Sequence, residues 1–439
     1  MQLHGTMGIN EKGHLEIGGC DTVSLAREFG TPLWVMDEAC IRQQCRNFKK
    51  AFIDKTNGDV AYASKAFLNL AMAVIIKEEG LSLDVVSGGE LFTALQSGFP
   101  AQRIYFHGNN KSREEILMAI HSGVGRIMVD NFYEAEMIEE IARDTGWGPV
   151  AVMLRIAPGV EAHTHEYCQT GQEDSKFGFS LASNQAMEAV KLISRSEVLE
   201  LKGIHCHIGS QIFETESFVV AIDIMLDFMA SIYQETGFII EELNLGGGFG
   251  IYYSQGDAPQ SIEAYADKII AAVSVKADRV GLPVPKIIVE PGRAIVGPAG
   301  TTLYTLGAAK NIPGIRKYVS VDGGMSDNIR PALYGAVYEA MAANKALLEP
   351  GELVSVAGKC CESGDMLIWD IPLPHLEPGD ILAVSCTGAY CYTMSSNYNR
   401  LPRPAVVLVR DGQAEVIVKG ESYEDILRND LLPQRLANG

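Results

Sequence analysis

Short apolar runs alternate with longer amphipathic segments over residues 59–292. Apolar runs of four to eight residues are typical of parallel strands buried on both faces, and apolar positions recurring every three or four residues predict helices. The predicted strands lie at 60–64, 81–87, 104–107, 126–130, 150–156, 201–208, 242–245 and 286–290. Eight strand–helix units predict an α/β fold of the (β/α)8 TIM-barrel type. A doubly wound open sheet is the alternative that the same alternation allows.

Two of the predicted helices have recognisable ends. Ser112 and Glu115 have the spacing of a capping box, and the helix that they open is expected to stop near Gly123. A second helix is expected from Asn131, with periodic apolar positions to Arg143 and a stop at Gly146. Such local signals support the alternation of strands and helices.

After Val296 the pattern changes to short β-branched runs at 317–321, 352–356, 381–385 and 405–409. Asp411-Gly412 separates two such runs and predicts a two-residue hairpin. A largely antiparallel β domain is therefore expected. We predict a barrel domain at 35–292 and a β domain at 1–34 and 293–439, with the N-terminal segment packing on the latter.

Composition narrows the functional classes. The chain has 439 residues and a formal charge of −19, with 55 acidic and 36 basic residues, so we expect neither nucleic acid nor an anionic membrane as partner. No apolar run approaches the roughly 20 residues of a membrane-spanning helix, and the N-terminal stretch does not resemble a signal peptide. The expected location is the cytoplasm, where the nine cysteines would be reduced.

Polar residues that could act in binding or catalysis lie at or just past the carboxyl ends of the predicted strands. Barrel enzymes gather their functional groups at these ends. They are Lys65, Asp84, Ser87, His107, Arg155, His205, His207, the glycine-rich run at 246–250 and Glu290. This placement predicts that they meet at one end of the barrel.

Three of these features together are the parts needed to hold pyridoxal phosphate. A desolvated Lys65 near other positive charge could form a Schiff base, although most lysines are simply solvated. The glycines of 246–250 let backbone N–H groups approach a phosphate, although a tight βα turn needs glycines too. Glu290 ends an apolar strand and needs a partner, either a protonated pyridine nitrogen or an arginine such as Arg293.

The histidines allow a different hypothesis. His205 and His207 lie on one face of a strand and could form half of a metal site, with His107 and Asp84 as further ligands. A second histidine pair lies in a polar loop: His163 and His165. A metal site gives no role to the lysine, the glycines and the glutamate, so we favour His207 as a ring that stacks on a planar cofactor, and expect no metal.

The chain resembles the fold-type III pyridoxal-phosphate decarboxylases over nearly its whole length. The resemblance is carried by YASKA at 62–66, SGGEL at 87–91, HGNNK at 107–111, HTHEY at 163–167, DSKFG at 174–178, HIGSQ at 207–211, GGGFG at 246–250, EPGR at 290–293, DGGM at 322–325, RPALY at 330–334, CESGD at 361–365, GAY at 388–390 and MSSNYN at 394–399. It implies a barrel plus a β domain, and the decarboxylation of meso-2,6-diaminopimelate to L-lysine.

By matching motifs, the resemblance implies that Lys65 binds the cofactor covalently, that His207 stacks on its ring and that Glu290 pairs with the ring nitrogen. Further implied cofactor contacts are Asp84, Ser210, Gly247, Gly248, Gly292, Arg293 and Tyr390. The implied substrate contacts are Arg293, Arg330, Tyr334, Glu362 and Tyr390.

The resemblance also implies a homodimer with shared active sites, in which Cys361 and Glu362 act from the partner subunit. Cys361 would be the proton donor. The family pattern has a Gly-Pro pair within the segment that reads Ala357-Gly358-Lys359-Cys360 in this chain. A second cysteine also adjoins the first, so Cys360 is the alternative donor. Cys391 and Tyr392 also depart from the small residue that is expected after Tyr390.

Three other functions stay open on the sequence. A pyridoxal-phosphate decarboxylase of ornithine or arginine would need no site for a second carboxylate. A metal-dependent barrel hydrolase would use the histidines. A non-catalytic homologue would keep the fold but lack the lysine or the cysteine, and both are present.

Overall fold

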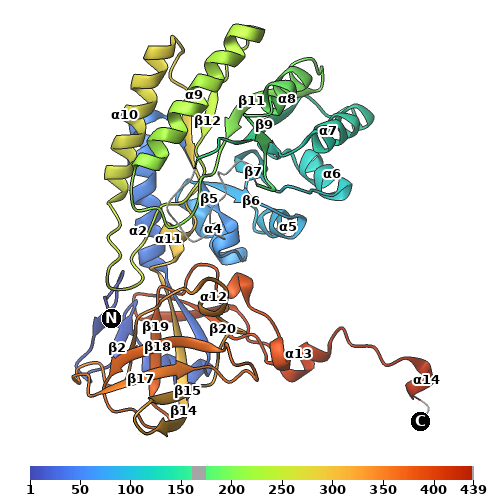
Figure 1. Cartoon of the computed structure of the whole chain (residues 1–439). Coiled ribbons are helices and arrows are strands. Elements are labelled where there is room, and N and C mark those ends of the chain that lie inside the picture. Colours follow the sequence, from blue (N-terminus) through green and yellow to red (C-terminus); the bar gives the residue numbers. More distant parts are fainter. Residues whose placement is uncertain (161–174, 438–439) are drawn as a thin grey trace. The chain divides into compact units, whose positions relative to one another are not determined.

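The computed structural model describes residues 1–160 and 175–437, and the chain divides into two compact units (Figure 1). The barrel unit comprises Arg42–Tyr252 and Gly256–Ile295, and the β unit comprises Met1–Ile41, Tyr253–Gln255 and Val296–Gly439. Among the described residues, no helix combines the length and the apolar character needed to cross a membrane.

Eight parallel strands form a closed ring in the described part of the barrel unit. They are β5 (Asp59–Ala63), β6 (Ser82–Val85), β7 (Ile104–Phe106), β8 (Arg126–Val129), β9 (Val150–Ala157), β11 (Leu199–His205), β12 (Glu242–Asn244) and β13 (Lys286–Val289). The pairing of β8 with β9 closes the ring. Each strand overlaps a predicted one, so the predicted barrel is confirmed and the open-sheet alternative is wrong.

The barrel closes because its strands are apolar on both faces. Inward-facing residues from five strands form a packed cluster at its centre: Ala61, Tyr105, Met128, Met153 and Ile288. Opposite faces of the strands pack under the surrounding helices, so most strand residues are buried. The centre is therefore filled by side chains, and the polar residues gather beyond it at the carboxyl ends of the strands.

Helices surround these strands, as Figure 1 shows for α4 to α8. The described α-helices of the barrel unit are α3 (Asp54–Thr56), α4 (Leu70–Glu78), α5 (Gly88–Gln96), α6 (Arg113–Ser122), α7 (Phe132–Thr145), α8 (Gln185–Ile193), α9 (Glu216–Thr236) and α10 (Ile262–Val280). Two more helices cross the sequence boundary between the units: α2 (Glu38–Phe48) and α11 (Arg293–Val296). Ser112 makes the predicted capping box with Glu115, and α6 ends at Gly123. Helix α7 runs from its cap Asn131 to Gly146. Both predictions are confirmed.

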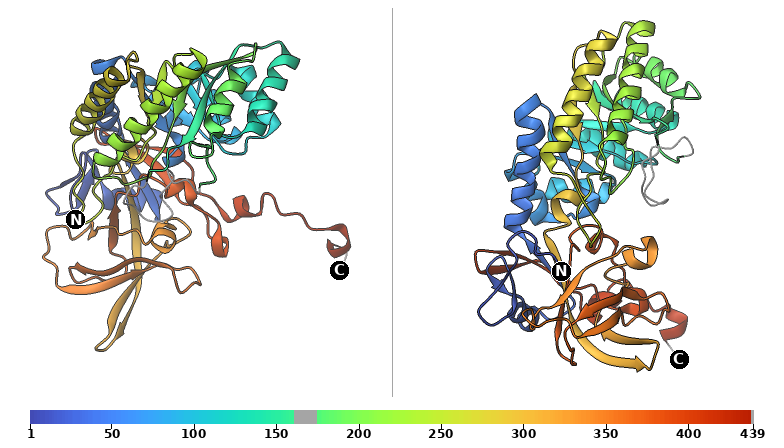
Figure 2. Two further views of the ribbon diagram at one scale, coloured as in Figure 1. Left: turned by 45° about the horizontal axis from the view of Figure 1, so that its top comes forward. Right: turned by 60° about the vertical axis from the view of Figure 1, so that its left-hand side comes forward.

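The β unit, whose C-terminal segments are drawn in orange to red in Figure 2, is built on a mixed sheet. Its strand pairs are mostly antiparallel. Its strands are β4 (Leu33–Asp37), β14 (Gly300–Ile312), β15 (Arg316–Val321), β16 (Ala340–Ala342), β17 (Glu352–Ala357), β18 (Met366–Leu373), β19 (Ile381–Ser385), β20 (Ala405–Arg410) and β21 (Gln413–Val418). The pairs β15–β17 and β20–β4 are parallel. The predicted, largely antiparallel β fold is confirmed.

The predicted hairpin joins β20 to β21 through Asp411 and Gly412. Both turn residues have positive φ, at 51° and 78°, as a type I′ turn requires. From the N-terminal segment, β4 pairs with β14 and β20. A small sheet, β1 (Gly8–Ile9), β2 (Leu15–Ile17) and β3 (Cys20–Asp21), precedes α1 (Thr22–Phe29). Short helices complete the unit: α12 (Arg330–Tyr334), α13 (Tyr423–Leu427) and α14 (Gln434–Ala437).

Candidate active site

The carboxyl ends of the barrel strands bring the predicted polar residues together. Strand register places Arg155, His205 and Asn244 side by side on β9, β11 and β12. Asp84 pairs with Ala63 across β6 and β5, two residues before Lys65. The predicted gathering of polar groups at one end of the barrel is therefore present.

Lys65 lies on a short, fixed turn. After β5 the chain forms a single 3₁₀ turn, Ser64–Ala66, in which Ser64 and Ala66 are buried and Lys65 is exposed. The Tyr62 hydroxyl donates to the Phe67 carbonyl across this turn at 2.7 Å. Ser64 donates to Glu90 at 2.9 Å. These bonds hold the backbone, so the lysine side chain is presented from a rigid base.

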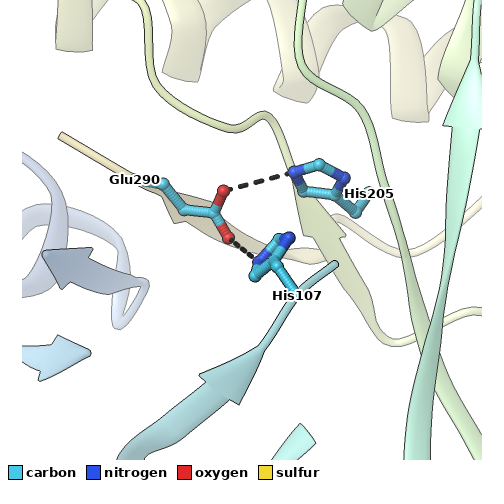
Figure 3. A group of neighbouring side chains, drawn as sticks. All are labelled: His107, His205 and Glu290. Carbon is cyan, nitrogen blue, oxygen red and sulfur yellow. Dashed lines mark hydrogen bonds and ion pairs between the residues drawn. The ribbon is translucent and has the colours of Figure 1, made fainter. Parts of the chain in front are cut away.

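Glu290 is the most heavily bonded acid of the site. Its Oε1 accepts hydrogen bonds from His107 Nε2 at 2.8 Å and from Asn244 Nδ2 at 2.6 Å, and its Oε2 lies 3.2 Å from His205 Nε2. Figure 3 shows both imidazole rings directed at the two carboxylate oxygens. All four side chains are buried. Arg293, considered as a partner for Glu290, donates to Ser210 Oγ at 2.8 Å.

The surroundings shift the pKa values of the two buried acids in opposite directions. Burial by itself would raise the pKa of Glu290, but His107 and His205 outweigh it and hold that pKa well below its usual range. For Asp84 burial dominates and raises the pKa to about 6, against the opposing charges of His107 and Lys65. The influence of the Lys65 ammonium on Asp84 places it at the same end of the barrel as His107, which lies 3.8 Å from Asp84.

The glycine-rich run 246–250 follows β12. Gly246 and Gly248 have positive φ, and a Cβ on Gly247 would lie 2.3 Å from the Glu290 carbonyl oxygen, so side chains are excluded. Three backbone N–H groups of this run already have partners: Gly250 donates to the Ile212 carbonyl, Gly246 donates to Asn244 Oδ1, and Gly247 donates to His207 Nδ1 at 3.2 Å. The bond from Gly247 orients the His207 ring.

His207 is neutral in this setting. Its withdrawal from water and the positive charges of Lys65 and Arg155 lower the pKa of His207 well below the ordinary value. Because Nδ1 accepts from Gly247, the ring proton lies on Nε2. A neutral, oriented imidazole is suited to lie against the face of an aromatic ring.

The β unit holds the remaining candidates. Arg330, at the start of α12, is 7% exposed and donates to the hydroxyls of Tyr253 and Tyr338 at 3.0 and 2.6 Å. Among the described residues, no carboxylate lies within 4.0 Å of its guanidinium. Tyr334 and Tyr390 are half-buried, and Tyr390 has a positive φ of 62°. A buried cation with only hydroxyl partners is suited to bind an anion.

The segment that carries the adjacent cysteines is shaped by two side chains. Asp365 accepts the N–H groups of Met325 and Cys360, and Asn399 accepts the N–H of Cys361 at 2.7 Å. Cys360 is 8% exposed, whereas Cys361 and Glu362 are exposed. Of the two thiols, Cys361 is therefore the one that faces solvent in a single chain.

The metal hypothesis placed His205 and His207 in the same metal site. In the part of the chain that the structure describes, the one group spaced for a metal ion is instead His107, His205 and Glu290, with ligand atoms within 4.8 Å of one another. The pair His163 and His165, and Asp174 of the motif at 174–178, lie outside the described residues.

Sequence reasoning did not single out Asn244. Its side chain is fully buried and contacts both Glu290 and the glycine-rich run. Its position as the last residue of β12, directly before the glycines, is the signal that could have identified it.

Comparisons of family, sequence and structure all match the chain to pyridoxal-dependent decarboxylases. Residues 38–297 match the family model described as "Pyridoxal-dependent decarboxylase, pyridoxal binding domain". The chain is 57% identical to the diaminopimelate decarboxylase of Bacillus subtilis over 98% of both chains, and 47% identical to that of Staphylococcus aureus over 97% of this chain and 99% of the relative. It superposes on the crystal structure of diaminopimelate decarboxylase from M. jannaschii in complex with L-lysine with a TM-score of 0.92, at 37% identity, over 99% of this chain and 100% of that chain.

Proposed function

Because the chain belongs to the pyridoxal-dependent decarboxylases, and among them to the diaminopimelate decarboxylase family, we propose that it decarboxylates meso-2,6-diaminopimelate. The products are L-lysine and CO2, and the reaction is the last step of lysine biosynthesis. The enzyme is a carboxy-lyase that depends on pyridoxal 5′-phosphate. The substrate assignment is supported by relatives of that name over nearly the full chain.

The observation that carries this function is the buried, ionised Glu290 at the barrel end that holds Lys65. Two buried polar atoms of the same group, Asp84 Oδ1 and His205 Nδ1, have no hydrogen-bond partner among the described residues. An amine, an ionised acid, an acceptor and a glycine-rich turn fit a pyridoxal phosphate. When bound, this cofactor supplies an electron sink for the electron pair left by the departing CO2.

We assign the following roles to the residues around the cofactor. The Lys65 amine binds the cofactor covalently, His207 lies against its ring, and Glu290 keeps the ring nitrogen protonated by remaining ionised. Phosphate contacts come from Ser210, Gly248 and the backbone of Gly292 and Arg293, with Tyr390. Asp84 and Gly247 are further cofactor contacts. In this structure the Gly247 N–H bonds to His207, so its contribution is to orient that ring.

The second carboxylate of the substrate separates this function from its closest rival. A decarboxylase of ornithine or arginine needs no cation for the distal end of its substrate. Arg330, buried and without a carboxylate partner in the described residues, supports a substrate with two carboxylates. We propose Arg330, Arg293 and Tyr334 as the distal carboxylate site.

The remaining assignments follow the family resemblance. We propose a cytoplasmic homodimer with shared active sites. Cys361 returns a proton to the substrate Cα in the partner's site, and Glu362 contacts the distal amino group. The cofactor-binding domain is proposed to extend over residues 35–292, with the β domain formed by 1–34 and 293–439.

Replacement of Lys65 by alanine tests the function directly. The Lys65→Ala protein is expected to lose both the absorbance band near the violet edge and the release of CO2, because no amine remains to bind the cofactor covalently. The matched control is Lys50→Ala, an exposed lysine outside the site, which should keep both.

The substrate is tested with the same purified protein. CO2 release is measured with meso-diaminopimelate, ornithine and arginine side by side, and only the first is expected to react at a substantial rate. Faster turnover of ornithine would replace the substrate assignment, whereas an absorbance band and CO2 release that persist in Lys65→Ala would refute the role of the lysine.

A further inference from the structure

Glu290 has three donors that are held in place by the barrel. Two come from histidines at the ends of β7 and β11 and one from Asn244 at the end of β12. A carboxylate has about four acceptor positions, so three donors leave one of them open, and protonation of the carboxyl group would occupy it. Only the ionised form therefore keeps an acceptor position open for a further donor.

The direction of the Asn244 amide is fixed by its other contact. Its Oδ1 accepts the N–H of Gly246 at 2.9 Å, and a backbone N–H can only donate, so Nδ2 must face Glu290. The Glu290 N–H in turn donates to the Gly246 carbonyl at 2.8 Å. The acid and the start of the glycine-rich run are thereby joined by side-chain and backbone bonds.

His205 has one tautomer available for this contact. Its Nδ1 is buried without a partner, and burial lowers the pKa of His205 to about 4, so the ring is neutral. With the single proton on Nε2, the ring donates to Glu290 Oε2 and leaves only a lone pair unpaired. The His107 ring lies edge-on to it, with centroids 4.8 Å apart, and its Nε2 faces Oε1.

We infer that His107, His205 and Asn244 are positioning residues that form a three-donor clamp on Glu290 and leave one acceptor position, on Oε2, for the protonated ring nitrogen of the cofactor. Oε1 receives two of the three donors and Oε2 receives one. The clamp thus holds the glutamate ionised and in one orientation before the cofactor arrives. This inference rests on the proposed function, since it concerns the partner of the cofactor ring.

Two substitutions of His205 distinguish its role as a hydrogen-bond donor from a role in packing alone. In His205→Gln the amide nitrogen takes about the place of Nε2 and can still donate, whereas His205→Met fills the space without a donor. Loss of one hydrogen bond to a charged acceptor predicts roughly tenfold weaker cofactor binding and a roughly tenfold lower kcat in His205→Met. His205→Gln should stay within about twofold of the wild type, and KM should change little in either variant.

Asn244→Asp tests the third donor. It replaces a donor 2.6 Å from Glu290 with a second carboxylate, so cofactor binding is expected to weaken roughly 10- to 100-fold. The matched control is Asn69→Asp, a buried asparagine of the same unit whose capping oxygen is retained. That control should bind the cofactor like the wild type.

The readouts are the dissociation constant of pyridoxal phosphate for the cofactor-stripped full chain and the infrared carboxyl signal that disappears in Glu290→Gln. An ionised signal in the wild type that becomes protonated in Asn244→Asp supports the clamp. Equal behaviour of His205→Gln and His205→Met, or wild-type binding by Asn244→Asp, overturns it. In those cases the Lys65→Ala result still stands, so failure of the clamp is separate from failure of the proposed function.

Discussion

At the carboxyl end of the barrel strands, burial and neighbouring charge give chemically similar side chains different pKa values. Glu290 and Asp84 are both buried carboxyls, yet the pKa of Glu290 is held low by two histidines while burial raises that of Asp84 to about 6. Cys206, between two histidines in sequence, is inert because burial raises its pKa to about 12. Residue type alone would not separate these groups.

The adjacent cysteines differ in the same way. Cys360 is buried, its N–H bonds to Asp365, and burial raises the pKa of its thiol. Cys361 is exposed. Cys361→Ser is therefore expected to lower kcat roughly 100-fold with little change in KM, because a positioned proton donor is lost. Cys360→Ser should stay within about threefold of the wild type.

Steady-state kinetics with meso-diaminopimelate measure this difference, and thiol labelling of the cofactor-stripped protein identifies which cysteine reacts first. A large loss of kcat in Cys360→Ser, with Cys361→Ser unaffected, would move the role to Cys360.

Helices and hairpins were predictable where their signals are local. The capping box of α6, the Asn131 cap of α7 and the Asp411-Gly412 turn each depend on a few neighbouring residues, and each is present. Strand β14, in contrast, was not predicted. It is stabilised by pairing with β15, which follows it directly, and with β4 and β19, which are distant in sequence.

Removal of the α6 cap tests such a local signal. Ser112 accepts the Glu115 N–H, and Glu115 Oε2 accepts the Ser112 N–H. Ser112→Ala leaves a helix N–H without its partner and is expected to cost about 1 kcal/mol of unfolding free energy. Calorimetric melting measures the loss. Ser194→Ala, an exposed serine after α8, is the control and should change stability by less than about 0.5 kcal/mol.

At the level of the whole molecule, buried acids of the β unit link stability to pH. Asp327 is fully buried, accepts hydrogen bonds from Tyr304 and from the Gly324 N–H, and has Asp365 and Asp322 near it. Burial raises the pKa of Asp327 to about 7. The native state therefore holds a proton that the unfolded chain releases near its ordinary pKa of about 4.

The difference between the folded and unfolded pKa of Asp327 sets the direction in which stability changes with pH. The stabilising contribution of protonated Asp327 is complete below about pH 4 and is lost as the pH rises towards about 7. Asp327→Asn removes this titration, so its melting temperature relative to the wild type should rise between pH 5 and about pH 7 and then level off. Calorimetry over that range measures it, with the exposed Asp278→Asn as control. A difference that is constant or falls with pH would contradict the assignment.

The order of elements and the end of the barrel at which Lys65 and Glu290 lie could be read from the amino-acid pattern, because strand and helix periods are local and parallel strands share one carboxyl end. The partners of Glu290 could not, since they lie 46, 85 and 183 residues away in the chain. Three further features also depend on segments that lie far apart in the chain: the pairing of β4 with β20, the burial of Cys360 and the protonation of Asp327. Desolvation and long-range pairing exist only once distant segments are packed together.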